Sequence, residues 1–136
     1  MKILQPPNWL APRGYANGTM SAVTVGSRLI FVGGQIGWNG QQQFETDDLG
    51  EQVGQALRNI VDVLKEGGAA PEHITRMTWY VKDKKEYVAA YKAIGQHYRA
   101  IIGKHFPAMT AVEVADLVED RAKVEIEVTA VVPPGA

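Results

Sequence analysis

Residues 123–132 read Lys-Val-Glu-Ile-Glu-Val-Thr-Ala-Val-Val, and this stretch decides the fold. Its even-numbered residues are all apolar, whereas Glu125, Glu127 and Thr129 stand between them. Such an alternation is typical of a β-strand with one buried face, because successive side chains point to opposite sides of a sheet. The stretch therefore predicts a strand of a sheet that is covered on one face, with both glutamates on the other face.

Four more strands are predicted upstream of this one. Runs of apolar and β-branched residues bounded by turn residues place them at residues 22–25, 29–32, 74–81 and 108–114. Gly26-Ser27 is expected to form a hairpin turn between the first two. The proline- and glycine-rich segment 4–18 is expected to be an irregular arm. The glycine-rich segment 33–40 is expected to be a loop that brings bare backbone close to a partner.

Two amphipathic helices are predicted between the strands. In the first, apolar residues recur every three or four positions at Val53, Ala56, Leu57, Ile60, Val63 and Leu64. Asp47 or Asp48 is expected to cap this helix, and Gly67-Gly68 to end it. The second helix is predicted from Lys85 to Ile102, where Gly103 stops it.

The predicted order of elements is β-β-α-β-α-β-β. It indicates an α+β fold in which two helices pack on one face of a single sheet. The 136 residues, 14.9 kDa in mass, fit one domain over residues 1–136.

Composition excludes several classes of protein. The chain carries 14 Lys+Arg against 15 Asp+Glu, a net charge of −1, whereas proteins that follow nucleic-acid phosphates show a clear basic excess. Cysteine is absent, which excludes disulfides, thiolate nucleophiles and zinc fingers. The three histidines are dispersed, so no metal site is expected. With no signal segment and no apolar stretch of about 18 residues, we expect a cytoplasmic protein without a nucleic-acid or membrane partner.

The uncovered face of the predicted sheet is unusual. Met109 and Glu113 on the neighbouring strand are expected to project to the same side as Glu125 and Glu127. A face that mixes glutamates with Met, Ala, Thr and Val suits neither a core nor a fully solvated surface. It is either a half-hydrated face with scattered carboxylates or a subunit interface that encloses polar groups, where pockets often form.

A longer motif lies in the C-terminal part of the chain. It reads FPAMTAVEV at residues 106–114 and VEIE at residues 124–127, and is supported by GQI at 34–36 and TWYVKD at 78–83. These segments, in this order and spacing, resemble the RidA/YjgF family of reactive-intermediate imine deaminases, also called the endoribonuclease L-PSP family. The resemblance covers the chain from about Gly14 to Val132.

The resemblance implies a chorismate-mutase-like α+β fold assembled as a homotrimer, with three ligand pockets between subunits. It also implies hydrolysis of enamine or imine intermediates, such as 2-aminoacrylate, to a keto acid and ammonia without a cofactor. In that scheme a glutamate on the last strand, here Glu125, positions the water. A tyrosine near the N-terminus falls on Tyr15, and a glycine whose backbone completes the pocket falls on Gly34. Gly33 beside it is a further candidate, from the sequence itself, to present backbone groups to a ligand. Trp38 is a further candidate for the pocket rim, through its ring and its indole N–H.

Two positions depart from the pattern of the active deaminases. Those proteins read Pro-Ala-Arg, with the arginine clamping the substrate carboxylate, where this chain has Met109. A position that is usually asparagine falls on Tyr91. A thioether offers no hydrogen bond of the kind that a guanidinium gives a carboxylate, so the substrate is expected to differ from 2-aminoacrylate. Four arginines are candidates to replace the clamp, none singled out by its spacing: Arg13, Arg28, Arg76 and Arg121.

Three functions of different classes follow. The first is a cofactor-independent deaminase of an enamine or imine, at a pocket between subunits. The second is a non-catalytic trimer that binds a small metabolite, in which the loss of the arginine marks the loss of chemistry. The third is a ribonuclease or translation inhibitor, which the near-neutral charge and the lack of a His–Lys constellation disfavour.

Overall fold

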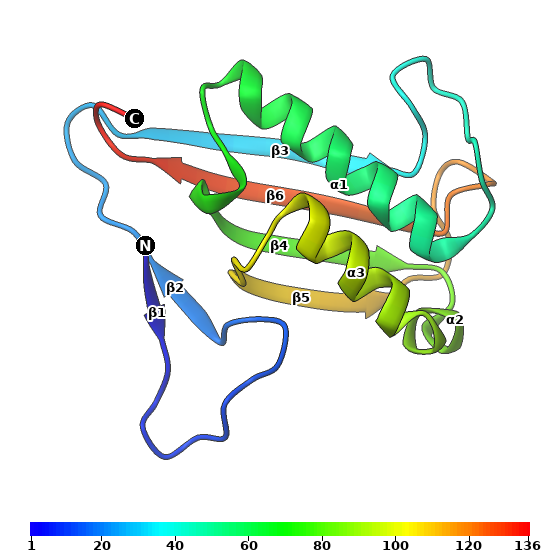
Figure 1. The fold of residues 1–136 in the computed structure, drawn as a ribbon, viewed down its shortest axis with the longest axis horizontal. Coiled ribbons are helices and arrows are strands. Elements are labelled where there is room, and N and C mark those ends of the chain that lie inside the picture. The colour runs from blue at the N-terminus through cyan, green and yellow to red at the C-terminus, as the bar shows by residue number, and fades with distance from the viewer.

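The computed structural model describes residues 1–136 and is built on one four-stranded sheet (Figure 1). Its strands are β3 (Arg28–Ile36), β4 (Ile74–Val81), β5 (Ala108–Glu113) and β6 (Val124–Val132), in the order β3-β6-β4-β5. β6 pairs antiparallel with β3 and β4, and β5 runs parallel to β4 at the edge of the sheet. The predicted strands 74–81, 108–114 and 123–132 are therefore confirmed to within one residue.

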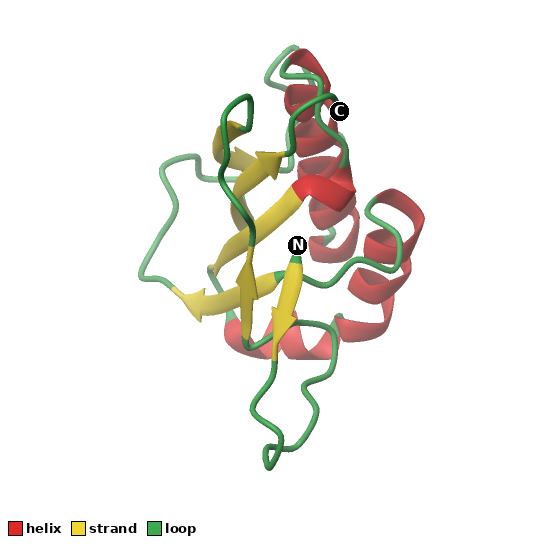
Figure 2. Ribbon diagram, turned by 90° about the vertical axis from the view of Figure 1, so that its left-hand side faces the viewer, coloured by secondary structure: helices red, strands yellow, loops and turns green.

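The helices lie on one side of this sheet, as Figure 2 shows. They are α1 (Leu49–Glu66), the single turn η1 (Pro71–His73), α2 (Lys84–Ala89) and α3 (Tyr91–Ile101). α1 packs on β3, β6 and α3. The α+β class with helices on one sheet face is confirmed.

The core forms where the alternation of β6 meets the apolar stripe of α1. All five even-numbered residues of β6 are buried, with at most 3% of their surface exposed. Five members of the α1 stripe are completely buried against them, namely Val53, Ala56, Leu57, Ile60 and Leu64. The sixth, Val63, is 41% exposed, because it stands at the edge of the stripe. Burying a side chain of this size stabilises a fold by about 1.5–3 kcal/mol, so this contact is the main source of stability.

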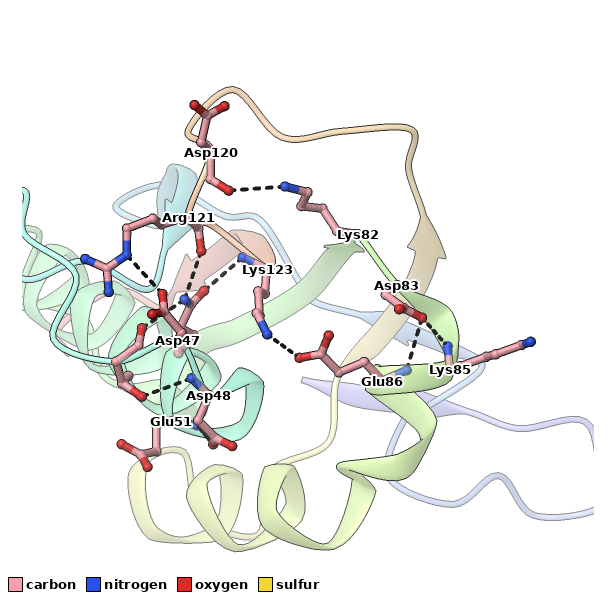
Figure 3. A network of polar contacts seen from close by, with 12 residues as sticks. Asp47, Asp48, Glu51, Lys82, Asp83, Lys85, Glu86, Asp120, Arg121 and Lys123 are labelled. Atoms are coloured by element: carbon pink, nitrogen blue, oxygen red, sulfur yellow. Dashed lines mark hydrogen bonds and ion pairs between the residues drawn. The ribbon is translucent and has the colours of Figure 1, made fainter.

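Polar contacts join the start of α1 to the loop before β6 (Figure 3). Asp48 is the capping residue, because its carboxylate accepts a hydrogen bond from a backbone N–H of the first turn at 2.9 Å. Asp47 instead pairs with Arg121 at 2.9 Å, and Lys123 pairs with Glu86 of α2 at 2.7 Å. Exposed pairs contribute at most about 1 kcal/mol each, so these contacts orient the loop more than they stabilise the fold.

The structure has two helices where the sequence predicted a single second helix. α2 ends and α3 begins at Ala90, whose ψ of 5° departs from helical geometry. Asp83 caps α2 by accepting from two backbone N–H groups at 2.9 and 3.2 Å. The apolar stripe continues across the break, with Tyr87 and Tyr91 in contact, so periodicity alone predicted one continuous helix.

The N-terminal part of the chain also differs from the prediction. Residues 22–25 form no strand, because β3 pairs only with β6, and Val25 is 99% exposed. The predicted second strand is longer than expected: β3 continues through Gly33 and Gly34 to Ile36, with a bulge between Val32 and Gln35. The ends of the arm form a second, two-stranded sheet of β1 (Lys2–Leu4) and β2 (Gly18–Met20).

One buried polar side chain connects α1 both to the loop that precedes it and to the loop that precedes β6. Gln52 is completely buried, and its amide donates to the carbonyl groups of Thr46 and Arg121 at 3.1 and 3.0 Å. Its amide oxygen accepts from the Lys123 N–H at 2.9 Å. The backbone of Gly37 packs directly on this side chain, and a Cβ added there would lie 2.8 Å from Gln52 Cα.

Gly37→Ala is therefore expected to lower the free energy of unfolding by about 1–3 kcal/mol, because the new methyl group overpacks a buried contact. Urea denaturation measures this change. Gly40→Ala is the matched control in the same loop, since nothing lies within 4 Å of the added Cβ, and it is expected to shift stability by less than about 0.5 kcal/mol. Equal stability of the two variants would contradict the close contact.

Candidate functional site

A cavity of about 920 Å³ lies between the helices α2 and α3, the edge strand β5 and the N-terminal arm. Six aromatic residues line it: Tyr15, Trp79, Tyr87, Tyr91, Tyr98 and Phe106. Met109 lies in its wall, and Arg13, Lys84 and Arg99 also line it. We call it the aromatic cavity.

The N-terminal arm reaches this cavity because it is attached to the start of β5. Ala16 forms an isolated parallel bridge with Ala108, and its N–H donates to the Pro107 carbonyl at 3.0 Å. Ala16 is only 4% exposed. The residues just before it, Arg13 and Tyr15, consequently line the cavity although they precede β5 by more than 90 positions.

The aromatic residues form a continuous wall. Tyr87 and Tyr91 meet edge to face with ring centres 5.2 Å apart, across the break between α2 and α3. Tyr98 stacks on Phe106 at 5.5 Å, and Trp79 lies 6.4 Å from both Tyr87 and Tyr98. Such pairs each contribute about 0.5–1.5 kcal/mol beyond their buried area, so these contacts stabilise the arrangement of the rings.

Partial burial in the wall makes two of its tyrosine hydroxyl groups harder to ionise. Burial raises the pKa of Tyr87 to about 12, with a smaller contribution from Tyr91, and also raises the pKa of Tyr98. The Tyr98 hydroxyl donates to the His105 carbonyl, whereas the Tyr87 hydroxyl has no hydrogen-bond partner. The indole N–H of Trp79 is buried and also unpaired. The inner part of the cavity is therefore apolar and poor in hydrogen bonds.

Met109 and Glu113 lie on the face opposite to the one predicted. β5 pairs with β4 in parallel, and the register sets Met109 beside Met77 and Glu113 beside Val81, both buried under the helices. Met109 therefore packs against the core on the helix side. The Glu113 carboxylate accepts a hydrogen bond from the Lys84 N–H at the start of α2, at 2.8 Å. The alternation within β5 correctly predicted which residues share a face of the strand. It did not predict which of the two faces the helices cover.

A smaller pocket of about 250 Å³ lies on the open face of the sheet, and we call it the carboxylate pocket. Gly34, Tyr80, Glu125 and Glu127 contribute to it. The Tyr80 hydroxyl donates to Glu127 at 2.8 Å, and this hydrogen bond to an anion raises the pKa of Tyr80. No hydrogen bond or ion pair of the structure engages Glu125, whose side chain is therefore available to a ligand or a water.

Gly34 is required by the position of Glu125. A Cβ added at Gly34 would lie 2.8 Å from both Cγ and Cδ of Glu125, so any other residue there would force the carboxylate to move from this position. Gly33 is different, since nothing lies within 4 Å of a Cβ added there, and its carbonyl accepts from the Gln35 amide at 3.1 Å. The carboxylate thus lies directly on the bare backbone of β3.

The predicted site residues consequently fall into two groups. Tyr15, Tyr91 and Met109 meet in the aromatic cavity, whereas Gly34 and Glu125 meet in the carboxylate pocket, and the two share no lining residue. Met109 and Glu125 lie on opposite faces of the sheet, although the lining of the aromatic cavity also includes Thr110 and Val112 of the edge strand, which alternate with Met109. β4 also lies between β5 and β6, which sets β5 and β6 about 10 Å apart. A single chain does not bring its own Glu125 to its own Met109.

Trp38 lies in neither pocket. Its ring packs on Phe44 with ring centres 5.9 Å apart, and its carbonyl accepts from the Asn59 amide at 2.8 Å. Trp38 and Phe44 also form an isolated antiparallel bridge. These contacts fold the loop between β3 and α1.

Among the four candidate arginines, only Arg13 lines the aromatic cavity. Arg28 donates to the Ala136 carbonyl at 3.3 Å, Arg121 pairs with Asp47, and Arg76 is exposed on the open face. Two further cations were missed, Lys84 and Arg99. Arg99 was detectable, because it stands eight residues after Tyr91 and so shares its face of the helix.

Two further findings concern the chain as a whole. No three His, Asp or Glu side chains lie close enough together to hold a metal ion. No helix is both long and apolar enough to cross a membrane.

The fold and these two pockets define an α+β protein with a cavity of about 920 Å³ at the edge of its sheet. The family model of endoribonuclease L-PSP matches residues 11–132, and the chain belongs to this family, which includes the RidA/YjgF proteins. The resemblance stated from the sequence, and the chorismate-mutase-like fold that it implies, are thereby confirmed.

Individual relatives agree with this assignment. A RutC family protein of Synechocystis sp. is 32% identical over 135 residues, 98% of each chain. The human protein named 2-iminobutanoate/2-iminopropanoate deaminase is 28% identical over 120 residues, 88% of this chain and 84% of its own. The crystal structure of the Rid family protein YyfB from Yersinia pestis, titled as of unknown function, superposes with a TM-score of 0.82 at 26% identity and covers 95% of this chain and 96% of its own.

Because tyrosines of the cavity wall are partly buried, the free energy of unfolding is expected to change with pH in the alkaline range. A tyrosine in an unfolded chain ionises near pH 10, whereas Tyr87 in the folded chain ionises near 12. The unfolded state therefore releases its proton first, and the free energy of unfolding falls as the pH rises from about 10 towards 12. Tyr87→Phe removes this group without removing a hydrogen bond, so urea denaturation at pH 8, 10 and 11 is expected to show a smaller fall than in the parent. Parallel curves for the two proteins would contradict the raised pKa of Tyr87.

Proposed function

We propose that the chain hydrolyses an enamine or imine to a carbonyl compound and ammonia, in a homotrimer whose sites each combine two copies. The observation that carries this proposal is the separation of Met109 and Glu125 by the sheet of one chain. A site that uses both residues needs the aromatic cavity of one copy and the carboxylate pocket of the next. The name of the human relative, an imine deaminase, supports the reaction class.

The open face of the sheet supports the assembly. Phe31 and Leu29 of β3 are 75% and 51% exposed, and Val112 of β5 is 42% exposed. The strand register sets all three on the same face as Glu125. Apolar side chains gathered on one uncovered sheet face are typical of a surface that another subunit covers. Burial of this face would also shield Glu125 from bulk solvent, apart from the water that reacts.

The reaction needs few groups from the protein besides a correctly positioned base. An enamine first takes a proton from water on carbon and loses one from nitrogen to water, and so becomes an imine. Glu125 then accepts a proton from a water whose oxygen bonds to the imine carbon, while the C=N electron pair moves to nitrogen. The same carboxyl group returns that proton to nitrogen, which gives a carbinolamine. Glu125 then accepts the hydroxyl proton and passes it to nitrogen, so that the C–N bond breaks and ammonia leaves with the bonding electron pair as the C=O bond forms. The unengaged carboxylate on the backbone of Gly34 fits this alternation of base and acid.

Met109 affects which substrates the cavity can bind. It lies in the wall of the aromatic cavity, where a methionine provides an apolar and adaptable surface but no donor for a carboxylate. Small imino acids that depend on an arginine clamp are therefore expected to be poor substrates. The same residue favours a second candidate function, a non-catalytic trimer that binds a metabolite in this cavity and returns it unchanged.

Glu125→Gln is expected to lower kcat/KM for imine hydrolysis by about 10²–10⁴, the usual contribution of a general acid–base group. Amino-acid oxidases generate imines from a panel of amino acids, and semicarbazide traps what escapes hydrolysis. Glu127→Gln is the matched comparison on the same strand and face, and is expected to lose less than about ten-fold, because its carboxylate is engaged by Tyr80. Equal rates for Glu125→Gln and the parent would remove Glu125 from the reaction. A parent protein that hydrolyses no imine would favour the non-catalytic binder.

Met109→Arg is expected to raise turnover of the alanine-derived imine by about ten-fold or more. The new guanidinium would offer charge-assisted hydrogen bonds worth about 1.5–3 kcal/mol each to the carboxylate. The same coupled assay measures the gain, and Met109→Leu, which adds no charge, is expected to give none. A gain with leucine, or none with arginine, would show that the missing clamp is not what limits small substrates.

A further inference from the structure

The aromatic cavity holds cations that nothing in the chain neutralises. Arg13, Lys84 and Arg99 side chains form none of the ion pairs of the structure. The only acidic residue that lines the cavity is Glu113, and its carboxylate already accepts the backbone N–H at the start of α2. The cavity thus has a net positive charge and suits an anionic ligand.

The positions of these groups give the cavity a polarity from floor to mouth. Trp79 and Tyr98 are 1% and 8% exposed, so they form the floor. Arg13 and Arg99 are exposed, so they stand at the mouth, together with Tyr91, which is 55% exposed. An aromatic floor with a cationic mouth is matched by a ligand that has a ring at one end and an acid group at the other.

The size of the cavity agrees with such a ligand. A volume of about 920 Å³ is at the upper end of the range for small-molecule sites, about 300–1,000 Å³, and a three-carbon imino acid would leave most of it empty. Tyr87 and Tyr91 offer ring edges and faces to a planar group, at the place where the break between α2 and α3 brings them together.

We propose that the cavity binds aromatic imino acids, with the ring among Tyr87, Tyr91 and Met109 and the acid group held by Arg13 and Arg99. This inference rests on the proposed function for the reaction, but the ligand class follows from the cavity itself. The imine carbon of such a ligand lies next to its acid group. It would therefore stand at the mouth, on the side from which a neighbouring copy would present Glu125.

Three stable probes separate the contributions of ring and charge. 3-Phenylpropionate has both, propionate lacks the ring, and 3-phenylpropionamide lacks the charge. Titration calorimetry of the full chain is expected to show that 3-phenylpropionate binds at least ten-fold more tightly than either of the others. Equal affinity for all three, or no binding of any, would overturn the proposal.

Single-residue variants test which residues bind the acid group of the ligand and which bind its ring. Arg13→Gln and Arg99→Gln are expected to reduce the preference for the acid over the amide by at least five-fold. Tyr91→Ala is expected to weaken binding of 3-phenylpropionate by about 2- to 13-fold, the range for one aromatic contact. Arg58→Gln removes a charge from α1 outside the cavity and is expected to alter neither. An effect of Arg58→Gln as large as that of Arg13→Gln would mean that overall charge, not the cavity mouth, selects the acid.

The coupled imine assay separates failure of this inference from failure of the proposed function. The phenylalanine-derived imine is expected to be hydrolysed with at least ten-fold higher kcat/KM than the alanine-derived one. Equal hydrolysis of the two would support the deaminase and overturn the ligand class. Selective binding of 3-phenylpropionate without hydrolysis of either imine would support the ligand class and overturn the deaminase.

Discussion

The alternation of side chains along β6 is the constraint on which the rest of the structure depends. It buries Val124, Ile126 and Val128 beneath α1 and so leaves Glu125 on the opposite face. The parallel register between β4 and β5 then sets Met109 on the helix side. These two facts follow from strand geometry and not from flexible side chains. One chain therefore presents the two parts of its candidate site in different directions, and a partner copy is the simplest way to join them.

The sequence predicted those parts of the fold that local periodicity determines. β4, α1 and β6 each carry a pattern eight or more residues long, and their bounds agree with the structure. Residues 22–25 carried the same kind of pattern but formed no strand, because a strand also needs a partner that local sequence does not specify. The break at Ala90 was hidden for a related reason, since the apolar stripe continues through it.

The candidate site was predictable in its residues but not in their arrangement. The resemblance indicated Glu125, Tyr15 and Gly34, and the structure gives a physical reason for the glycine in its contact with the carboxylate. The register between β4 and β5 was not predictable, so Met109 was expected on the wrong face. Arg99 was missed because its role depends on what α3 faces.

The most direct test of a two-copy site is complementation between two inactive variants. Glu125→Gln removes the base, and Gly95→Trp fills the aromatic cavity from α3, where an added Cβ meets only Arg99, at 3.6 Å or more. The two proteins are unfolded, mixed in equal amounts and refolded, and imine hydrolysis is measured. If each site combines two copies, random mixing restores about one quarter of the parental sites, those that join an open cavity to an intact Glu125. Activity of the mixture no higher than that of the separate variants, with mixed oligomers present, would contradict a site shared between copies.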